Sequence, residues 1–121
     1  MLEKTIKYTD YRGNEREETF YFNLSEAELT ELNFEASGNL PEQLERIVKT
    51  MDVSAMGDIY KKFILKAYGE ISPDGRRFMK DDGKLAKAFA ETEAYSVLYR
   101  ELLEKENAAV DFFKAVLPNK G

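Results

Sequence analysis

Residues 2–24 read LEKTIKYTDYRGNEREETFYFNL and predict a β-hairpin at the start of the chain. In both halves of this stretch apolar residues alternate with polar ones, and both halves are rich in Thr, Tyr or Phe. A period of two with this composition is typical of strands that bury one face. Gly13 and Asn14 lie between the halves and tolerate the positive φ that tight hairpin turns require.

The parity of the two strands limits how they pair. Ile6 and Phe22 must face the same side, so we expect a loop with an odd number of residues and a bulge at Gly13. We expect this loop to place Ile6 near Phe22 and Tyr8 near Phe20. A lone two-stranded hairpin is marginal in water, so its aromatic face must rest on helices or on another chain's strands. The open edge also invites a strand from another copy, which makes a homo-oligomer one expectation.

Residues 25–117 read as a bundle of about five or six helices. Ser25 and Glu28 fit a capping box, in which the Ser25 hydroxyl caps the Glu28 amide and the Glu28 carboxylate reaches back. We expect this first helix to end at Gly38 and the next one to open around Pro41.

Further residues indicate where helices begin and end. Ser54 and Asn107 are each predicted to begin a helix, and Pro118 ends the last one. Thr92 leaves two alternatives open, because the apolar spacing around it fits one long helix or two helices with Thr92 as the cap. Residues 70–83 are rich in turn residues and form the main break.

The length of 121 residues corresponds to about one domain. We therefore expect a single α+β domain in which the N-terminal hairpin packs on a mostly helical bundle. Its parts are the hairpin at 1–24, the bundle at 25–117 and a frayed tail at 118–121.

The chain contains no cysteine and no histidine. Disulfides, thiolate metal sites, His-ligated zinc and Ser-His-Asp or Cys-His triads are therefore excluded. An enzyme would have to work with carboxylates, lysines, tyrosines and hydroxyls alone. We predict that the protein is not an enzyme and that it uses no cofactor or metal.

The acidic excess is concentrated in the first third of the chain. The formal charge is −5, and residues 1–36 account for all of it with 4 basic and 9 acidic side chains. Phosphate backbones are bound by clustered Lys and Arg, so nucleic acid and anionic membranes are disfavoured as partners. No apolar run approaches the ~18 residues of a membrane span, and no stretch resembles a signal peptide. We expect the protein to stay in the cytoplasm where it is made.

One loop carries the residues that come nearest to a metal or nucleic-acid site. Asp74, Asp81 and Asp82 form the best carboxylate cluster, but the calcium-loop spacing is absent and turn chemistry explains Asp74 and Asp82. Three basic residues with an aromatic among them form only a weak patch for nucleic acid. The simpler interpretation is a surface loop pinned to the body by Phe78. The basic residues are Arg76, Arg77 and Lys80.

The seven tyrosines and eight phenylalanines are a generous aromatic supply for a small domain. Several large apolar residues lie on the last short helix, where burial within one chain is least assured. Exposed apolar patches usually mark a partner surface, although this helix would equally well close the core. We predict partner contact at Tyr99, Leu103, Phe112, Phe113 and Val116.

Several stretches resemble a family of tail assembly chaperones from long-tailed bacteriophages. The similar stretches span most of the chain. They are KTIKYTDY (4–11), GNEREETFYFNL (13–24), ERIV (45–48), KAYGE (66–70), SPDGRRF (72–78) and TEAYS (92–96).

The resemblance implies a role in binding rather than catalysis. Such chaperones bind the long, largely helical tape measure protein in the host bacterial cytoplasm, keep it soluble and help the tail tube protein polymerise around it. They are absent from the finished virion, and many are also made in a longer, frameshifted form. The alternative function is a structural tail component, of the tube or terminator type, that stays in the particle.

Overall fold

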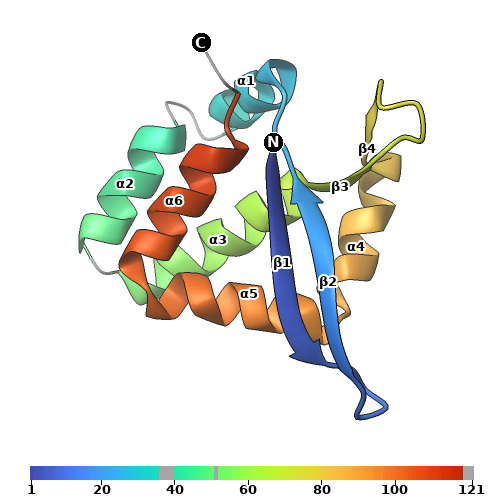
Figure 1. Cartoon of the computed structure of the whole chain (residues 1–121). Helices are drawn as coiled ribbons and strands as arrows, with labels where there is room; N and C mark the ends of the chain where they lie inside the picture. Colours follow the sequence, from blue (N-terminus) through green and yellow to red (C-terminus); the bar gives the residue numbers. More distant parts are fainter. Residues whose placement is uncertain (36–39, 51, 119–121) are drawn as a thin grey trace.

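The computed structural model describes residues 1–35, 40–50 and 52–118. These residues form an α+β fold in which helices gather on one face of an antiparallel sheet (Figure 1). The sheet order is β1-β2-β3-β4. The strands are β1 Leu2–Thr9, β2 Glu15–Phe22, β3 Tyr68–Ile71 and β4 Phe78–Met79. The helices are α1 Glu26–Glu35, α2 Leu40–Thr50, α3 Val53–Ala67, α4 Lys84–Ala90, α5 Glu93–Glu104 and α6 Glu106–Val116, with a 3-10 turn η1 at Asp81–Gly83.

The turn between β1 and β2 confirms the predicted bulge at Gly13. The Gly13 amide donates to the Asp10 carbonyl at 3.0 Å, and the Asp10 amide donates to the Asn14 carbonyl at 2.9 Å. Gly13 has φ of 86°. A tight turn followed by one residue in the left-handed region is the usual three-residue hairpin loop. The loop therefore has an odd number of residues, as the strand parity requires.

The predicted register of the hairpin is wrong by four residues. The loop is centred on Arg12, whereas pairing Ile6 with Phe22 would centre it on Asn14. The Asp10 carboxylate fixes this position, because its Oδ1 accepts from the amides of Arg12 and Asn14, each at 2.9 Å. The observed pairs include Leu2–Phe22, Lys4–Phe20, Ile6–Glu18 and Tyr8–Arg16.

The bundle predicted at 25–117 is mostly helical, but two short strands, β3 and β4, lie in and next to the expected break at 70–83. β3 extends the hairpin by pairing Tyr21 with Gly69 and Phe22 with Tyr68. The chain then turns at 72–77 and returns as β4. The predicted turn chemistry is correct, but it closes a second hairpin.

Gly69 explains why a strand forms at this point. A Cβ at this position would lie 2.5 Å from the Phe78 ring and 2.6 Å from the Met79 carbonyl oxygen. Only a glycine lets β4 approach so closely, and Phe78 does pin the loop to the body as predicted. Tyr68 stacks on Phe89 of α4 with ring centres 4.3 Å apart, which holds the other side of β3.

Two of the predicted helix caps are confirmed. The Glu28 amide donates to the Ser25 hydroxyl at 3.1 Å, and the Glu28 carboxylate accepts from the Ser25 amide at 2.9 Å. The Thr92 hydroxyl accepts from the Tyr95 amide at 3.3 Å, so α4 and α5 are two helices with Thr92 between them.

Two other caps are wrong. Asp52 begins α3, because its carboxylate accepts from the Ala55 amide at 3.2 Å, and Ser54 already lies inside the helix. α6 begins one residue before Asn107, and Lys105 flanks it. Both errors are shifts of one or two residues at helices whose existence was predicted. The predicted stop at Gly38 lies outside the described residues.

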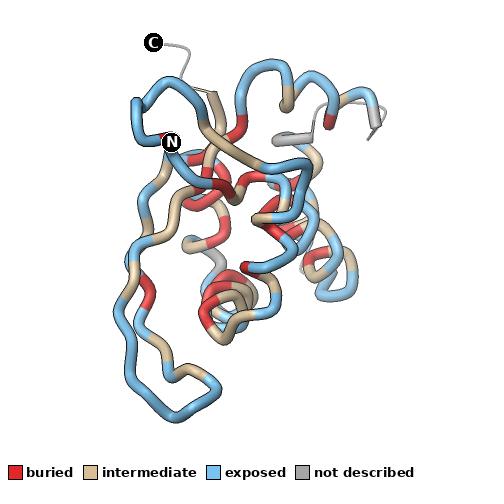
Figure 2. The backbone as a smooth tube through the Cα atoms, turned by 90° about the vertical axis from the view of Figure 1, so that its right-hand side faces the viewer, coloured by how far each residue is buried: buried red, intermediate tan, exposed pale blue. Residues whose placement is uncertain are grey.

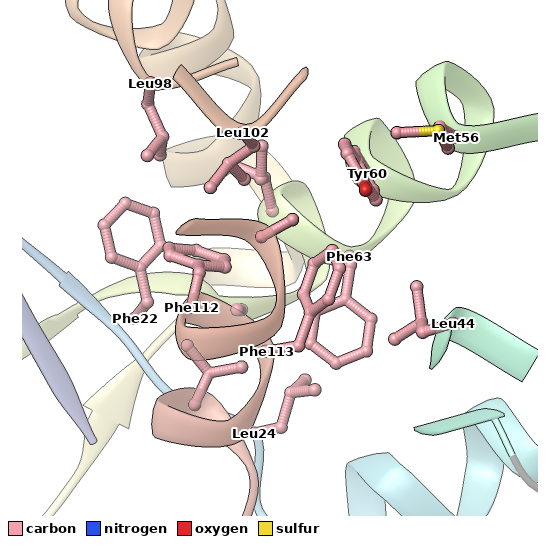
Figure 3. Packing of buried hydrophobic residues seen from close by; sticks show 14 of the residues in the cluster. Phe22, Leu24, Leu44, Met56, Tyr60, Phe63, Leu98, Leu102, Phe112 and Phe113 are labelled. Atoms are coloured by element: carbon pink, nitrogen blue, oxygen red, sulfur yellow. The ribbon is translucent and has the colours of Figure 1, made fainter. Parts of the chain in front are cut away.

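α6 packs one face against the core (Figure 3). Phe112 and Phe113 leave it on opposite sides, Phe112 toward Phe22 of the sheet and Phe113 toward Phe63 of α3. The Val116 carbonyl at the end of α6 accepts from the Leu24 amide just after β2, at 2.9 Å. The opposite face of the hairpin and its tip are exposed, as the blue stretches of Figure 2 show.

Candidate functional site

A small apolar groove lies between α2 and α6. Leu44 and Val48 from α2 and Phe113 from α6 are buried along it, while Val110 and Leu117 are half-buried. The space is about 40 Å³, which is room for about one small apolar group. Glu45 and Lys114 complete the lining with one charge of each sign.

The helix periodicity explains how these residues come together. Leu44 and Val48 are four residues apart, and Val110, Phe113 and Leu117 follow one another at three and four, so each set shares one face of its helix. The two helices contact each other, but their apolar faces do not fill the space between them. The groove can therefore accept an apolar side chain from another polypeptide.

The three α6 residues predicted to contact a partner are buried in the core. Phe112 packs against Phe22 with ring centres 5.1 Å apart, and Val116 is fully buried. Phe113 lies 4.7 Å from Phe63 between ring centres and also lines the groove. The structure thus brings Phe113 alone of these three to a surface feature.

The two α5 residues predicted to contact a partner are half-buried. The Tyr99 hydroxyl donates to the Gly57 carbonyl at 2.9 Å and so ties α5 to α3. Leu103 packs against the same core. The role of Tyr99 and Leu103 in partner binding stays a prediction.

The similarity to a known protein family extends over nearly the whole chain. A model of the phage tail assembly chaperone family matches residues 1–120. The chain belongs to this family. Membership implies a role that is not catalytic, and it confirms the resemblance seen in the sequence. No curated protein matches the chain, and no solved structure does.

Sequence reasoning missed the other groove residues of this chaperone. Leu44, Val48, Val110 and Leu117 show only the helical spacing that any core-facing residue shows. The missing information is which two helices lie side by side. A signal did exist in Glu45 and Lys114, which carry charges next to the apolar positions, but charges on exposed helix faces are too common to single them out.

The basic loop of the chaperone is tied to the protein body through Lys80. Its ammonium lies 3.1 Å from a Glu28 carboxylate oxygen and donates to the carbonyls of Asn23, at 2.9 Å, and Lys66. Burial lowers the pKa of Lys80, and the bonded Glu28 opposes that shift. Lys80 thus joins the end of β4 to the start of α1 and the end of α3. Its positive charge is paired with Glu28 within the chain.

Asp74, an acidic residue of the same loop, also has partners within the chain. The Ser72 hydroxyl donates to the Asp74 carboxylate at 2.6 Å and, with the Arg76 amide, holds the pKa of Asp74 below its usual value. In the part of the chain that the structure describes, no group of three or more acidic residues could hold a metal ion. Within the same part, no helix is long and apolar enough to cross a membrane.

In the described residues, the large exposed apolar side chains are spread over several elements. Phe34 and Tyr11 are the most exposed, at 78% and 76%. They belong to α1 and the hairpin loop, and the others are Met1, before β1, and one residue each of α3, α5 and β3. The α2–α6 groove is therefore the best-defined candidate for binding an apolar partner.

Proposed function

We propose that this chaperone binds the tape measure protein during tail assembly, keeps it soluble and promotes polymerisation of the tail tube protein around it. The observation that carries the proposal is the apolar α2–α6 groove in a chain of the tail assembly chaperone family. A long helical client exposes apolar helix faces that aggregate unless they are covered. Grooves between helices bind such faces through side chains at helical spacing. Assembly takes place in the host cytoplasm, and the chaperone leaves before the virion is complete.

The groove also suggests how strongly a single contact binds. Its floor is apolar and its volume is small, so one aliphatic anchor of the client fits, and the contact is weak by itself. Glu45 and Lys114 favour a client helix with charges of both signs beside that anchor. Many chaperone copies along one client then act together, because linked weak contacts add by avidity. The net charge of −5 keeps the coated client in solution.

Co-expression with a tape measure protein tests this proposal. The variant Val110→Lys places a charge in the groove and lowers the soluble fraction of the client by about half or more. Ala115→Lys is the matched control, because it puts the same charge on an exposed position of the same helix. Circular dichroism checks that both variants keep their helices. A client that is equally insoluble with and without the unchanged chaperone rules the proposal out.

Mass spectrometry of purified virions separates the proposal from the alternative of a structural tail component. A chaperone that acts during assembly is missing from the particle, whereas a tube or terminator component is present in fixed copy number. Detection of the chain in fixed copy number contradicts the proposed function.

A further inference from the structure

The outer edge of β1 is open. In residues 1–35, 40–50 and 52–118, β1 pairs with β2 alone, and the sheet order places it at the edge. The bond from the Asp10 amide to the Asn14 carbonyl makes these two a hydrogen-bonded pair. Hydrogen-bonded and non-bonded pairs alternate along an antiparallel ladder. Even-numbered residues of β1 therefore bond to β2, and odd-numbered ones point their backbone groups outward.

The residues with outward backbone groups are also the exposed ones. Glu3, Thr5 and Lys7 are exposed, and the Lys7 side chain reaches 81%. No backbone hydrogen bond to another described segment uses their outward amides and carbonyls. The helices contact β1 through its even-numbered face, where Ile6 is buried. An eight-residue strand with free backbone groups can accept another strand.

We propose that this edge pairs with β1 of a second copy of the chain. The two strands run antiparallel about a twofold axis at Thr5, and they join the two sheets into one of eight strands. In this register Glu3 lies opposite the partner's Lys7, and Lys7 lies opposite the partner's Glu3. Thr5 lies opposite the partner's Thr5. Opposite charges and paired threonines across strands are both favourable.

The charges select this register among the alternatives. An axis at Glu3 places the two Glu3 side chains opposite each other, and an axis at Lys7 does the same for the two Lys7 side chains. An axis at Lys4 brings two lysines together on the inner face. An axis at Ile6 leaves Glu3 and Lys7 opposite threonines. Like charges directly opposite destabilise a sheet, so the axis at Thr5 has the best complementarity.

Lys4 is the residue of β1 that could prevent another strand from pairing, because a lysine on the buried face of an edge strand discourages strand addition. Its ammonium turns onto α5 instead, where it lies 3.4 Å from a Glu101 carboxylate oxygen. The charge is neutralised within one chain and directed away from the strand edge. In the proposed register Lys4 lies opposite the partner's Ile6, and no second lysine approaches it.

Sedimentation equilibrium of the purified full chain tests the pairing. A single pair of strands buries little area, so we expect a dimer with a dissociation constant in the micromolar range. Thr5→Pro removes the outward amide at the axis and the hydroxyl that lies 2.9 Å from the Thr19 hydroxyl, but it leaves the backbone bonds to β2 intact, as proline is tolerated on the free side of an edge strand. Thr5→Val is the matched control, because it removes the same hydroxyl and keeps the outward amide. The Thr5→Pro variant is monomeric and keeps its circular dichroism spectrum. A chain that is monomeric at about 100 µM, or a dimer that Thr5→Pro leaves unchanged, overturns the proposal.

Charge exchange tests the register itself. Glu3→Lys and Lys7→Glu each place like charges opposite each other, and each raises the dissociation constant about tenfold. Mixing these two variants restores complementarity, so an equal mixture forms a heterodimer with near-original affinity. Glu15→Lys is the matched control, because it changes the charge on the same face of the hairpin away from the β1 edge. A mixture no tighter than its components contradicts the register. None of these positions lines the α2–α6 groove, so the dimer and the client interaction fail independently.

Discussion

The first hairpin has two ends: a base next to the helices, which is called its buried half, and a projecting half that ends in the turn. The two share one ladder of hydrogen bonds but differ in the contacts that stabilise them. The half next to the helices buries Phe22 completely, with ring centres 5.1 Å from Phe112 and 5.8 Å from Phe89. The half beyond Ile6 projects past the helices to an exposed tip (Figure 2). Both halves show the same alternation of side chains. Their neighbours determine whether that alternation stabilises the strand by burial.

Polar contacts replace burial in the projecting half. On its inner face the Tyr8 hydroxyl donates to the Glu18 carboxylate, and Arg16 bonds to Asp10 at 2.6 Å and lies 3.6 Å from Glu18. At the tip, Tyr11 bonds to Glu93 at the start of α5, and this bond raises the pKa of Tyr11. Such exposed contacts are individually weak, so the projecting half depends on several of them together. We therefore expect mutations in the buried half to lower the free energy of unfolding strongly and mutations in the projecting half to lower it only slightly.

Phe22→Ala in the buried half gives the largest expected effect. The substitution leaves a cavity among Phe112, Phe89 and Tyr68, so the free energy of unfolding falls by about 3–5 kcal/mol. Urea denaturation followed by circular dichroism measures this change. Tyr21→Ala on the opposite face of the same strand is the control, and an equal loss there contradicts the comparison.

Lys80→Met tests the anchor at the end of the buried half. The substitution leaves Glu28 and the Asn23 carbonyl without their ammonium partner, and it lowers the free energy of unfolding by about 2 kcal/mol. The same denaturation experiment measures the change. Lys84→Met, at an exposed position at the start of α4, serves as the control and stays close to the unchanged protein.

Gly13→Ala tests the turn that sets the register. Its φ of 86° is costly for a residue with a side chain, although nothing lies within 4 Å of the new Cβ. The expected loss is about 1 kcal/mol, from backbone strain alone. Arg12→Ala in the same loop is the control. Equal melting temperatures for all three proteins would show that the tip does not contribute to stability.

Asp10→Asn is expected to have the smallest effect on stability. The effect appears as a change in how the stability of the turn depends on pH. The bond from Arg16 lowers the pKa of Asp10 to about 2 from its usual 3.8. A lowered carboxyl pKa stabilises the folded state above the usual value, and this stabilisation is lost as the pH falls toward about 2. The protection of the Arg12 and Asn14 amides against hydrogen exchange, relative to their intrinsic rates at each pH, therefore falls between these pH values. In Asp10→Asn this protection is already low at neutral pH and lacks this step.

The sequence predicted those features of the fold that depend on neighbours along the chain. The hairpin, the bulge at Gly13 and the caps at Ser25 and Thr92 each follow from a few adjacent residues. The register failed because it depends on how the Asp10 side chain closes the turn. The strand at 68–71 was missed because it depends on Phe78 passing over Gly69, and periodicity shows no such contact. Asp52 and Ser54 are equally good caps by type, so the sequence could not choose between them.

The candidate site was harder to predict for the same reason. The apolar spacing of α6 predicted Phe112, Phe113 and Val116 as partner contacts, with closure of the core as the equal alternative. It could not tell that β2 and α3 cover these residues within the chain. The groove beside Phe113 arises from an incomplete fit between α2 and α6, and that fit exists only in three dimensions.

The bond between the Leu24 amide and the Val116 carbonyl constrains how the protein matures on the ribosome. It joins positions 92 residues apart, and α6 supplies aromatic rings that complete the interior around Phe22 and Phe63. A nascent chain without α6 has no substitute for those rings, so it cannot reach the native state early. Folding therefore follows the emergence of α6, and a chain that stops before residue 106 lacks the rings that close its interior.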